Sequence, residues 1–481
     1  MSLTSSLNSA LAGLDLSARR AEVIARNVSS ADSQGYARRS VASAGAGIGL
    51  PGRGAAITRD IDPRLMQLRR EAQSRSAGEE TLQAFFTRLD KAIGQPDDPG
   101  SLQDGLARLD AAFVSAAADP TSSIRLTEIS EAAAGVASTL NALDDVVQGA
   151  RQGADADIGK AVEGLNRDLA GVARLNADIL RLNAGRHDSS DLLDQRTVLI
   201  DRISQQIPVR ELPRDDGTVA LVSVGGVLLL DGRPAQLGFA PRAPITAAMS
   251  APTHLSGLTV NGRTIQTGGA VNAIPGGNLT ALFQLRDEIA PQATARFDAM
   301  AAELIARFED PAVDVTIAPG GTGLFTDRGL PLDPAADAGL AGRIAINALV
   351  TPDRPDQHWR LRDGLGAAGA GSGGDASLLL RYGDAFAERR QPVLAGLPDI
   401  GADLAGHAAA LRSLVSADRV RADDRLGFAR IEATTLAEGR DGGRVDIDAE
   451  MRRLVEVEQA YAANARIIQA VSDMMNRLTE I

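Results

Sequence analysis

The sequence predicts a multidomain, mainly α-helical protein with β inserts, in which the terminal helices form a coiled coil or bundle and the middle forms a helical rod-like domain. Three observations support this prediction. Apolar residues at both chain ends recur at alternating spacings of three and four, which keeps an apolar seam on one helix face. The middle of the chain contains long helical patterns. Short β-rich runs between them are separated by Gly, Asn and Asp turns, which indicates an inserted β-rich domain.

The C-terminal segment 445–481 is predicted to be one helix with two adjacent apolar seams. The first seam consists of Val457, Ala460, Asn464, Ile467, Val471, Met474, Leu478 and Ile481. The second consists of Ile447, Met451, Leu454, Tyr461, Ala465, Ile468 and Met475. A single seam suits a simple dimer, whereas two seams can contact two neighbouring helices and predict a bundle or tube.

The N-terminal segment repeats the same pattern. Its seam consists of Leu3, Leu7, Ala10, Leu14, Ser17, Ala21, Ile24 and Val28, with Leu11, Ala18 and Ala25 alongside. These small residues allow close helix approach, and the bulky side chains of the C-terminal seam could fill the space. We therefore expect the two ends to be partners, although periodicity alone is equally compatible with two ordinary amphipathic surface helices.

Two polar residues of the C-terminal stripe have alternative interpretations. Asn464 on an apolar seam can fix helix register at a cost in stability, or can lie exposed at the edge of the stripe. We favour the register role. Tyr461 is either a core residue or a ring at a subunit boundary with its hydroxyl hydrogen-bonded.

A turn motif follows the first helix, in the segment Asn27 to Arg39. Gly35 can adopt positive φ after the helix ends, and Tyr36 begins an extended segment. The turn, with Asn27, Gly35, Tyr36 and Arg38, resembles the signature of the flagellar axial rod and hook protein family. That family usually has Thr-Pro where this chain has Ser33 and Gln34. The segments Val445 to Met451 and Glu458 to Ile468 resemble the family's closing helix, with its Gln-Ala-Tyr-x-Ala-Asn core.

Three internal stretches are similar to the member of this family that joins the flagellar hook to the filament. They are Asp191-Leu192-Leu193-Asp194-Gln195-Arg196, the segment Gly276 to Glu288, and Gly373-Gly374-Asp375-Ala376-Ser377-Leu378. The resemblance spans nearly the full length and is weakest in 213–271 and 310–371.

The resemblance implies a structural subunit that self-assembles on the hook tip and adapts it to the filament. It further implies contacts with copies of itself, with hook protein and with hook-associated protein 3, and a flagellar export chaperone on the C-terminal helix. Such subunits are exported without a cleaved signal peptide and assemble outside the cell, with ends that stay disordered until assembly. The alternatives are another axial component, such as hook protein, hook-associated protein 3 or flagellin, or an adhesin or enzyme carried by the inserts. The Asp-Leu-Leu-Asp-Gln-Arg stretch argues against another axial component.

Composition narrows the possible partners. The 481-residue chain has a net charge of −12 and 44% hydrophobic residues, without cysteine. It is long enough for several domains with real cores. Nucleic acid is an unexpected partner because basic residues are spread along the chain, and pairs such as Arg38-Arg39 and Arg69-Arg70 are expected to be solvated. No segment has the roughly 18 uninterrupted apolar residues that a membrane span needs, so we expect no membrane insertion.

The pattern along the chain divides it into seven parts. They are the N-terminal axial helix and extended segment (1–64), the first part of the helical domain (65–210), a β-rich insert (211–275), a helical return (276–310), a Gly- and Pro-rich insert (311–374), the last part of the helical domain (375–440), and the C-terminal axial helix (441–481). Long helices are expected over 124–150, 158–183 and 279–308, and from Ser377 onward. The pairs Gly225-Gly226 and Asn261-Gly262 predict hairpin turns.

Candidate chemistry is sparse. The four histidines lie far apart, without the His-Glu-x-x-His spacing of a metal site. The segment 369–374 fits G-x-G-x-x-G but lacks a convincing preceding strand, so we interpret it as a hinge whose Asp375 caps the next helix. Adjacent carboxylates such as Asp215-Asp216 lie in turn-like sequence. We therefore predict no enzyme, no cofactor and no metal.

Overall fold

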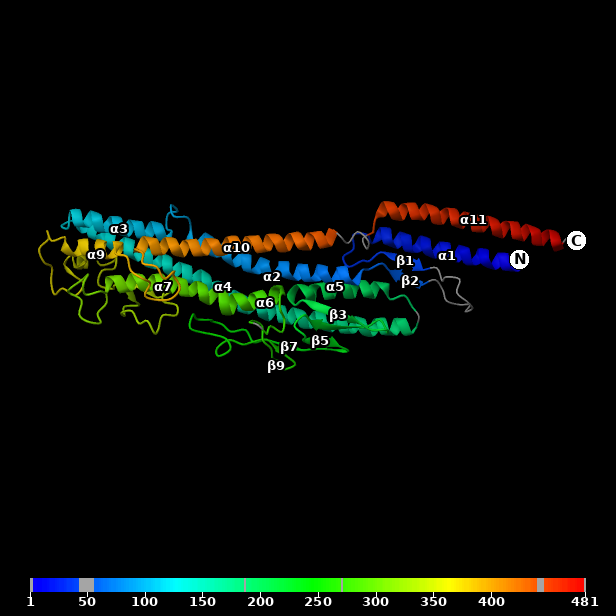
Figure 1. Ribbon diagram of the computed structural model, residues 1–481, viewed down its shortest axis with the longest axis horizontal. Helices are drawn as coiled ribbons and strands as arrows, with labels where there is room; N and C mark the ends of the chain where they lie inside the picture. Colours follow the sequence, from blue (N-terminus) through cyan, green and yellow to red (C-terminus); the bar gives the residue numbers. More distant parts are fainter. Residues whose placement is uncertain (1–2, 43–55, 186, 270, 439–444, 480–481) are drawn as a thin grey trace.

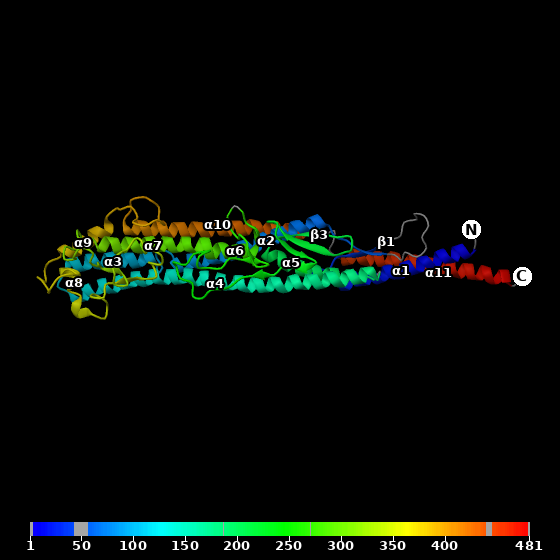
Figure 2. The ribbon, with the colours of Figure 1, turned by 90° about the horizontal axis from the view of Figure 1, so that it is seen from below.

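The computed structural model describes residues 3–42, 56–185, 187–269, 271–438 and 445–479. Long helices run side by side along one axis of an elongated molecule (Figures 1 and 2). Both ends of the chain lie at the same end of the molecule, where α1 (Leu3–Ser29) packs against α11 (Ile447–Thr479). The prediction that the terminal helices form a coiled coil or bundle is confirmed, and the pair forms within one chain.

The helical rod is built mainly from helices between these two. They are α2 (Pro63–Ile93), α3 (Leu102–Ala118), α4 (Ser123–Ala184), α5 (Ser190–Gln206), α6 (Gly277–Gln284), α7 (Ala290–Phe308), α8 (Arg360–Asp363), α9 (Ser377–Ala387) and α10 (Leu404–Glu438). Helix α2 packs against α10, α5 and α6, and α4 packs against α3, α5 and α7. Segments far apart in the sequence therefore lie side by side along the rod.

Helix α4 is continuous over 62 residues, where the sequence pattern suggested two segments separated near residues 151–157. Arg151 is buried at this point, and its guanidinium donates to the carbonyl oxygens of Arg286 (2.8 Å) and Thr246 (3.1 Å). Asp155 is also buried and forms an ion pair with Arg286 at 2.7 Å. The polar stretch that looked like a break is a buried contact surface for the β-rich insert and the 277–308 segment.

The predicted helix over 279–308 is confirmed with one irregularity. A π-helical turn at Leu285–Ile289 joins α6 to α7. Arg286 in this turn is fully buried, and its guanidinium carbon lies 5.5 Å from the ring centre of Phe239 and 5.0 Å from that of Phe283. Because Phe239 belongs to the insert and Phe283 to α6, this arginine joins the insert to the rod.

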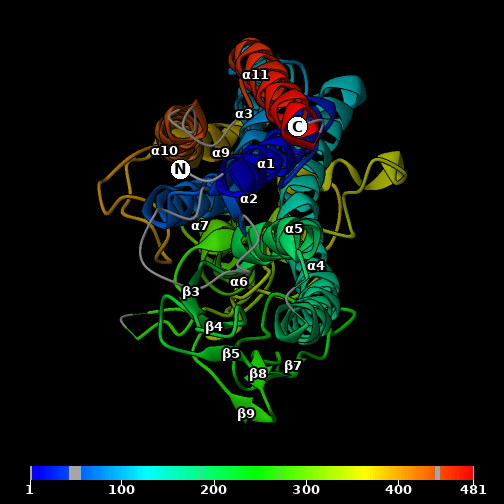
Figure 3. The same cartoon turned by 90° about the vertical axis from the view of Figure 1, so that its right-hand side faces the viewer.

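The β-rich insert contains two antiparallel sheets on one side of the rod, on the side of α4, α5 and α6 (Figure 3). The strands are β3 (Val209–Pro213), β4 (Val219–Ser223), β5 (Leu228–Asp231) and β6 (Arg233–Pro234) in one sheet, and β7 (Leu237–Gly238), β8 (Thr259–Val260) and β9 (Arg263–Thr264) in the other. The predicted turn at Asn261-Gly262 joins β8 to β9, and both residues have positive φ (50° and 78°). The predicted Gly225-Gly226 turn joins β4 to β5.

The second insert and the end of the rod differ partly from the prediction. The insert contains the antiparallel pair β10 (Phe325–Asp327) and β11 (Ile344–Ile346) and the short helix α8. Helix from Ser377 onward is interrupted between α9 and α10 by a segment that contains Pro392 and Pro398. The buried Arg307 holds this segment in place, since it donates to the carbonyl oxygens of Ala385 and Ala402, each at 3.0 Å.

A hydrophobic core extends along the rod and its inserts, from Leu82 to Ala422 in sequence. Toward the end of the rod distant from the termini, it includes an aromatic cluster of Phe113, Phe308, Phe325 and Tyr382 with ring centres 5.4 to 5.8 Å apart. Among the described residues, no side chain of α1 or α11 belongs to this core. The mainly α fold with β inserts is thus as predicted, and the axial pair lies outside its core.

Candidate assembly site

The terminal pair has one contact face and two exposed flanks. Within α11 the less exposed seam residues are Leu454, Val457, Asn464, Ala465, Ile468 and Val471, of which Val471 is buried. They lie on one face at helical spacing, and α1 is the helix that packs against α11. This face takes residues from both predicted seams, because it lies between them.

The contact face of α1 contains smaller side chains, as the sequence suggested. Ala10, Ser17, Val23 and Ile24 are buried, and Leu3, Leu7, Leu14 and Val28 are half-buried. A Cβ atom on Gly13 would lie 2.6 to 2.9 Å from the side-chain amide atoms of Asn464. The single glycine of α1 therefore lies directly opposite Asn464, which supports the register role for this residue.

Large apolar side chains remain exposed on the pair. Leu11 on α1 is 49% exposed, and on α11 the exposed fractions of predicted seam residues are 47% for Met451, 49% for Tyr461, 46% for Ile467 and 48% for Met474. The side chain of Leu478 lies outside the described part of the chain, as does Ile481. Apolar surface of this kind marks interaction sites on soluble proteins.

Asn27 is the centre of a polar cluster at the base of the pair. Its side chain is fully buried. The Nδ2 group donates to the backbone oxygen of Arg39 and to Oε2 of Glu450, both at 2.9 Å. Its Oδ1 atom accepts from the backbone N–H of Arg39 at 3.0 Å and from the hydroxyl of Tyr36 at 2.8 Å. The side-chain amide of Asn27 thus donates two hydrogen bonds and accepts two. Through its bond to Glu450 it joins α1 to α11.

Glu450 is the carboxylate of α11 in this cluster and is 1% exposed. Its Oε1 accepts from Nε of Arg38 at 2.8 Å, and it also forms an ion pair with Arg453. Burial raises the pKa of Glu450, but the hydrogen bonds from Asn27 and Arg38 outweigh burial and lower it below the usual value. Arg38 also pairs with Asp60 at 3.1 Å. The carboxylate therefore stays charged at neutral pH, with its charge compensated.

A second set of ion pairs joins the axial part to α5. Between α1 and α2, β1 (Arg39–Ala42) and β2 (Ala56–Arg59) form an antiparallel pair. The guanidinium of Arg39 lies 2.6 Å from Asp191 and 2.7 Å from Asp194, and that of Arg59 lies 2.5 Å from Asp194. Burial lowers the pKa of Arg59 below its usual value despite the charge of Asp194. The Asp-Leu-Leu-Asp-Gln-Arg stretch therefore holds the β1–β2 ribbon with its carboxylates.

Gly35 is required where the turn approaches α5. Its φ is 79°, and a Cβ atom there would lie 2.5 Å from a methyl carbon of Val198 and 2.9 Å from the backbone oxygen of Asp194. Both the backbone conformation and the lack of space favour glycine. The four motif residues Asn27, Gly35, Tyr36 and Arg38 are thus brought together, and we call them, with Glu450, Arg39, Arg59, Asp191 and Asp194, the junction cluster.

The prediction that the arginine pairs are solvated is wrong for Arg39, Arg69 and Arg70, which are all buried. Arg69 and Arg70 both bind Asp201, at 2.7 and 2.6 Å. Their acidic partners lie more than 100 residues away in the sequence, so local composition carries no signal for them. For Arg39 the available clue was the presence of Asp191 and Asp194 on one helical turn of the Asp-Leu-Leu-Asp-Gln-Arg stretch.

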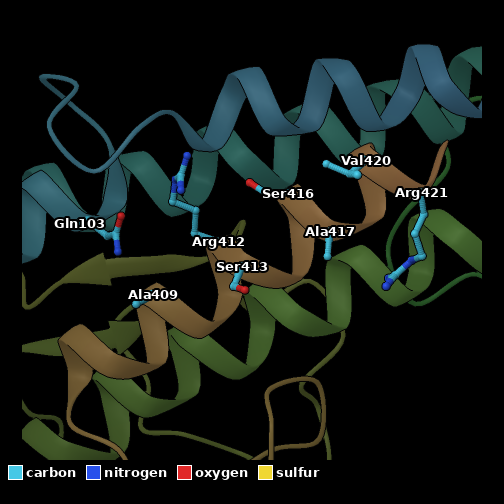
Figure 4. A pocket seen from close by; sticks show the side chains of 8 residues that line it. All are labelled: Gln103, Ala409, Arg412, Ser413, Ser416, Ala417, Val420 and Arg421. Atoms are coloured by element: carbon cyan, nitrogen blue, oxygen red, sulfur yellow. The ribbon is translucent and has the colours of Figure 1, made fainter. Parts of the chain in front are cut away.

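Among the described residues, no group of three or more His, Asp or Glu side chains could hold a metal ion. A groove along α10 is lined by Gln103, Ala409, Arg412, Ser413, Ser416, Ala417, Val420 and Arg421 (Figure 4). The Ser416 hydroxyl donates to Asp90 at 2.7 Å, and Arg412 donates to the backbone oxygen of Gly94 at 2.9 Å. Polar groups of this groove therefore serve packing of α10 on neighbouring segments.

The segment 369–374 leads into α9, and Oδ1 of Asp375 accepts from the backbone N–H of Ser377 at 2.8 Å. The N-cap residue of α9 is Ala376, and the helix has no side-chain capping hydrogen bond, so Asp375 makes this contact one residue before the cap and the expectation that it caps the helix is wrong. Of the helices in the described ranges, none combines the length and apolar character that crossing a bilayer requires.

Comparison with known proteins gives two family matches. The model of the flagellar hook-associated protein FlgK helical domain matches residues 86–312, and that of the flagellar basal body rod FlgEFG protein C-terminal region matches residues 444–481. The first covers much of the rod and the β-rich insert, and the second covers α11. The two matches thus cover helices of the rod, the β-rich insert and one helix of the axial pair.

Individual relatives agree with these matches. Flagellar hook-associated protein 1 of Salmonella typhimurium is 26% identical over 246 residues, and that of Escherichia coli strain K12 is 26% identical over 247 residues. Each match covers 49% of this chain and 44% of the relative, so the chain matches less than half of each relative's length. The solved flagellar hook junction protein FlgK from Burkholderia pseudomallei is similar with a TM-score of 0.42 and 21% identity, over 54% of this chain and 46% of that one. The family models and the curated relatives together show that the chain is similar to flagellar hook-associated proteins of the FlgK family.

Proposed function

We propose that this protein is a structural subunit of the bacterial flagellum that assembles on the tip of the hook and joins it to the filament. In this proposal residues 1–64 and 441–481 form the axial part, and residues 65–440 form the rod with its inserts. The protein acts by packing rather than by catalysis. It is exported without a cleaved signal peptide and functions outside the cell.

The observation that carries the proposal is the unpartnered apolar surface of the axial pair. Helix α11 uses one face for α1 and exposes Met451, Tyr461, Ile467 and Met474 on its flanks. Burial of apolar surface is worth about 25 cal/mol per Å2, so packing these flanks against neighbouring pairs supplies a driving force for assembly. Because the contact joins different surfaces of identical chains, it builds a helical or ring-like assembly rather than a closed dimer.

The junction cluster fits the same proposal. A subunit in a tube must hold its axial helices at a fixed angle to its rod, and the ion pairs of Arg39 and Arg59 with Asp194 connect these two parts. The neighbours along the axis would be hook protein on one side and hook-associated protein 3 on the other. Before export, a flagellar chaperone would cover the apolar stripe of α11, which an amphipathic helix offers to a groove.

The experiment that tests the proposal is deletion of the gene for this chain, followed by measurement of motility, filament attachment and flagellin in the medium. Intact hooks without filaments, with flagellin lost to the medium, are expected. Complementation with the full chain should restore attached filaments. Normal filaments in the deletion strain would contradict the proposed function.

A further inference from the structure

A groove of about 750 Å3 lies where the axial part meets the rod. It is formed by the segment 59–71, which includes the start of α2, together with α5 and strands β3 and β4. Its apolar lining includes Leu68 and Leu212, each 51% exposed. The groove therefore exposes aliphatic surface beside the junction cluster, at a place that no helix of the same chain covers among the described residues.

The groove is basic. Five arginines line it together with the carboxylates Glu71 and Glu211, and two of the five, Arg59 and Arg70, form ion pairs with Asp194 and Asp201 beside the groove. The five arginines are Arg59, Arg64, Arg70, Arg196 and Arg210. Arg64 and Arg210 are exposed, and within the described ranges their guanidinium groups have no carboxylate partner. Nε of Arg59 and Nη2 of Arg70 are buried without a hydrogen-bond partner in the same part of the chain. An occupant with apolar and acidic side chains would complement this surface.

One flank of α11 has that composition. Ile447, Met451 and Val455 recur at four-residue spacing and are 46%, 47% and 50% exposed. Asp448 and Glu458 lie on the same flank by helical spacing and are exposed. Among the residues that the structure describes, neither carboxylate has an ion-pair partner. This flank, which we call the acidic flank, points away from the α1 contact face, so it is available to another molecule.

We propose that the groove receives the acidic flank of α11 from a second copy of this chain. The inference rests on the proposed self-assembly and adds which surface of the neighbour α11 contacts. Ile447, Met451 and Val455 would pack on Leu68 and Leu212, while Asp448 and Glu458 would face Arg64 and Arg210. Groove and flank are different surfaces of one chain, so each subunit offers one to the next, and the contact propagates along a helical assembly.

Cross-linking between single-cysteine variants tests the pairing, because the natural chain contains no cysteine. Leu212→Cys marks the groove and Met451→Cys marks the acidic flank. Both full-length variants are expressed together in cells that lack the natural chain, and isolated hook and filament structures are treated with a short bismaleimide. The expected product is a mixed dimer of the two variants, identified by different tags. Pairing Met451→Cys with Val315→Cys, which is 71% exposed in the second insert, is the control and should give no mixed dimer.

Charge reversal provides an independent measurement. The variant Arg64→Glu/Arg210→Glu and the variant Asp448→Arg/Glu458→Arg should each lose the mixed dimer and the attached filaments, and the chain with all four substitutions should recover both. Attached filaments without the mixed dimer would overturn the pairing and leave the proposed function standing. Cross-linking of Leu212→Cys to itself or to a different protein would overturn the pairing in the same way. Attached filaments in the deletion strain without any copy of this chain would count against both the pairing and the proposed function.

Discussion

The rod and the axial pair are both built from long amphipathic helices, but they bury their apolar residues to very different extents. Helix α4 buries side chains along its whole length, from Leu126 to Ile179. In α11, by contrast, only Glu450 and Val471 are buried among the side chains that the structure describes. The rod thus completes its core within one chain, whereas the axial pair leaves large apolar side chains exposed. Similar periodicity can therefore accompany a buried core or an exposed apolar surface.

The largest effect should come from a charge in the exposed part of the axial stripe. Ile467→Asp should abolish incorporation into flagella and weaken chaperone binding, while the rod stays folded, because Ile467 is exposed in the single chain. Val471→Asp should in addition disrupt the α1–α11 pair, since Val471 is buried there. Filament counts by electron microscopy and circular dichroism measure the two effects. Ala470→Asp, at an exposed position away from the contact face, is the matched control. Normal incorporation of Ile467→Asp would show that the exposed apolar residues of the axial pair are not needed for assembly.

In the rod, removal of a core aromatic should change stability rather than assembly contacts. Phe308 is fully buried among Phe113, Phe325 and Tyr382. Phe308→Ala should lower the free energy of unfolding by about 3–5 kcal/mol, measured by urea denaturation. Phe428 on α10 is 76% exposed, and Phe428→Ala should change it by less than about 0.5 kcal/mol. Equal effects at the two sites would contradict the described core.

The response to pH should also separate the two regions. In the rod, burial raises the pKa of Asp298 to about 7, although the backbone N–H groups of Gly339 and Ala341 donate to it. An unfolded Asp has a pKa near 3.9. Between about pH 4 and pH 7 the folded state therefore keeps a proton on Asp298 that the unfolded state has lost. Stability from this group is therefore fully present below about pH 4 and is lost, at up to about 1.4 kcal/mol per pH unit, as the pH rises toward 7. Urea denaturation between pH 5 and 8 should show this slope in the natural chain and a flatter profile in Asp298→Asn; identical slopes would exclude Asp298 as its source.

The junction cluster should give the smallest and most local effect. Asn27→Ala leaves Glu450, Tyr36 and the backbone of Arg39 without their shared partner, at a cost of about 1–3 kcal/mol to the α1–α11 pair. Faster amide exchange in α1 and α11, with unchanged exchange in α4, is expected. The pKa of Glu450 is lowered in the folded state, whereas that of Asp298 is raised. The contribution of Glu450 to folding stability is therefore present at neutral pH and is lost as the pH falls through its folded pKa. Asn8→Ala at an exposed position of α1 is the control, and equal exchange in both variants would show that the cluster does not hold the pair.

The sequence was informative wherever structure depends on local pattern. Helix periodicity gave both axial helices, and the Asn261-Gly262 and Gly225-Gly226 pairs gave their hairpin turns. Long-range contacts could not be obtained in this way. Residues 151–157 look like a break until Arg286 and the insert are seen to cover Arg151 and Asp155, and Arg39 looks solvated until Asp194 is placed beside it.

The assembly surface shows the same limit. A stripe wide enough for two neighbours does not reveal which of its faces a given neighbour takes, so the α1 contact face lay between the two predicted seams. At two positions a close approach of distant segments favours glycine. Gly13 lies opposite Asn464, and Gly35 lies against α5. The role of each exposed seam residue stays a prediction until assemblies are measured.

The unbroken course of α4 has a mechanical consequence. At 1.5 Å per residue, its 62 residues make a strut of about 93 Å. The strut leads through a short turn into α5, whose Asp194 binds both Arg39 and Arg59 of the axial part. Torque applied at the axial helices would thus reach the far end of the rod along a path that includes the ion pairs of the junction cluster. Under load, we expect these ion pairs to separate before the continuous helix α4 breaks.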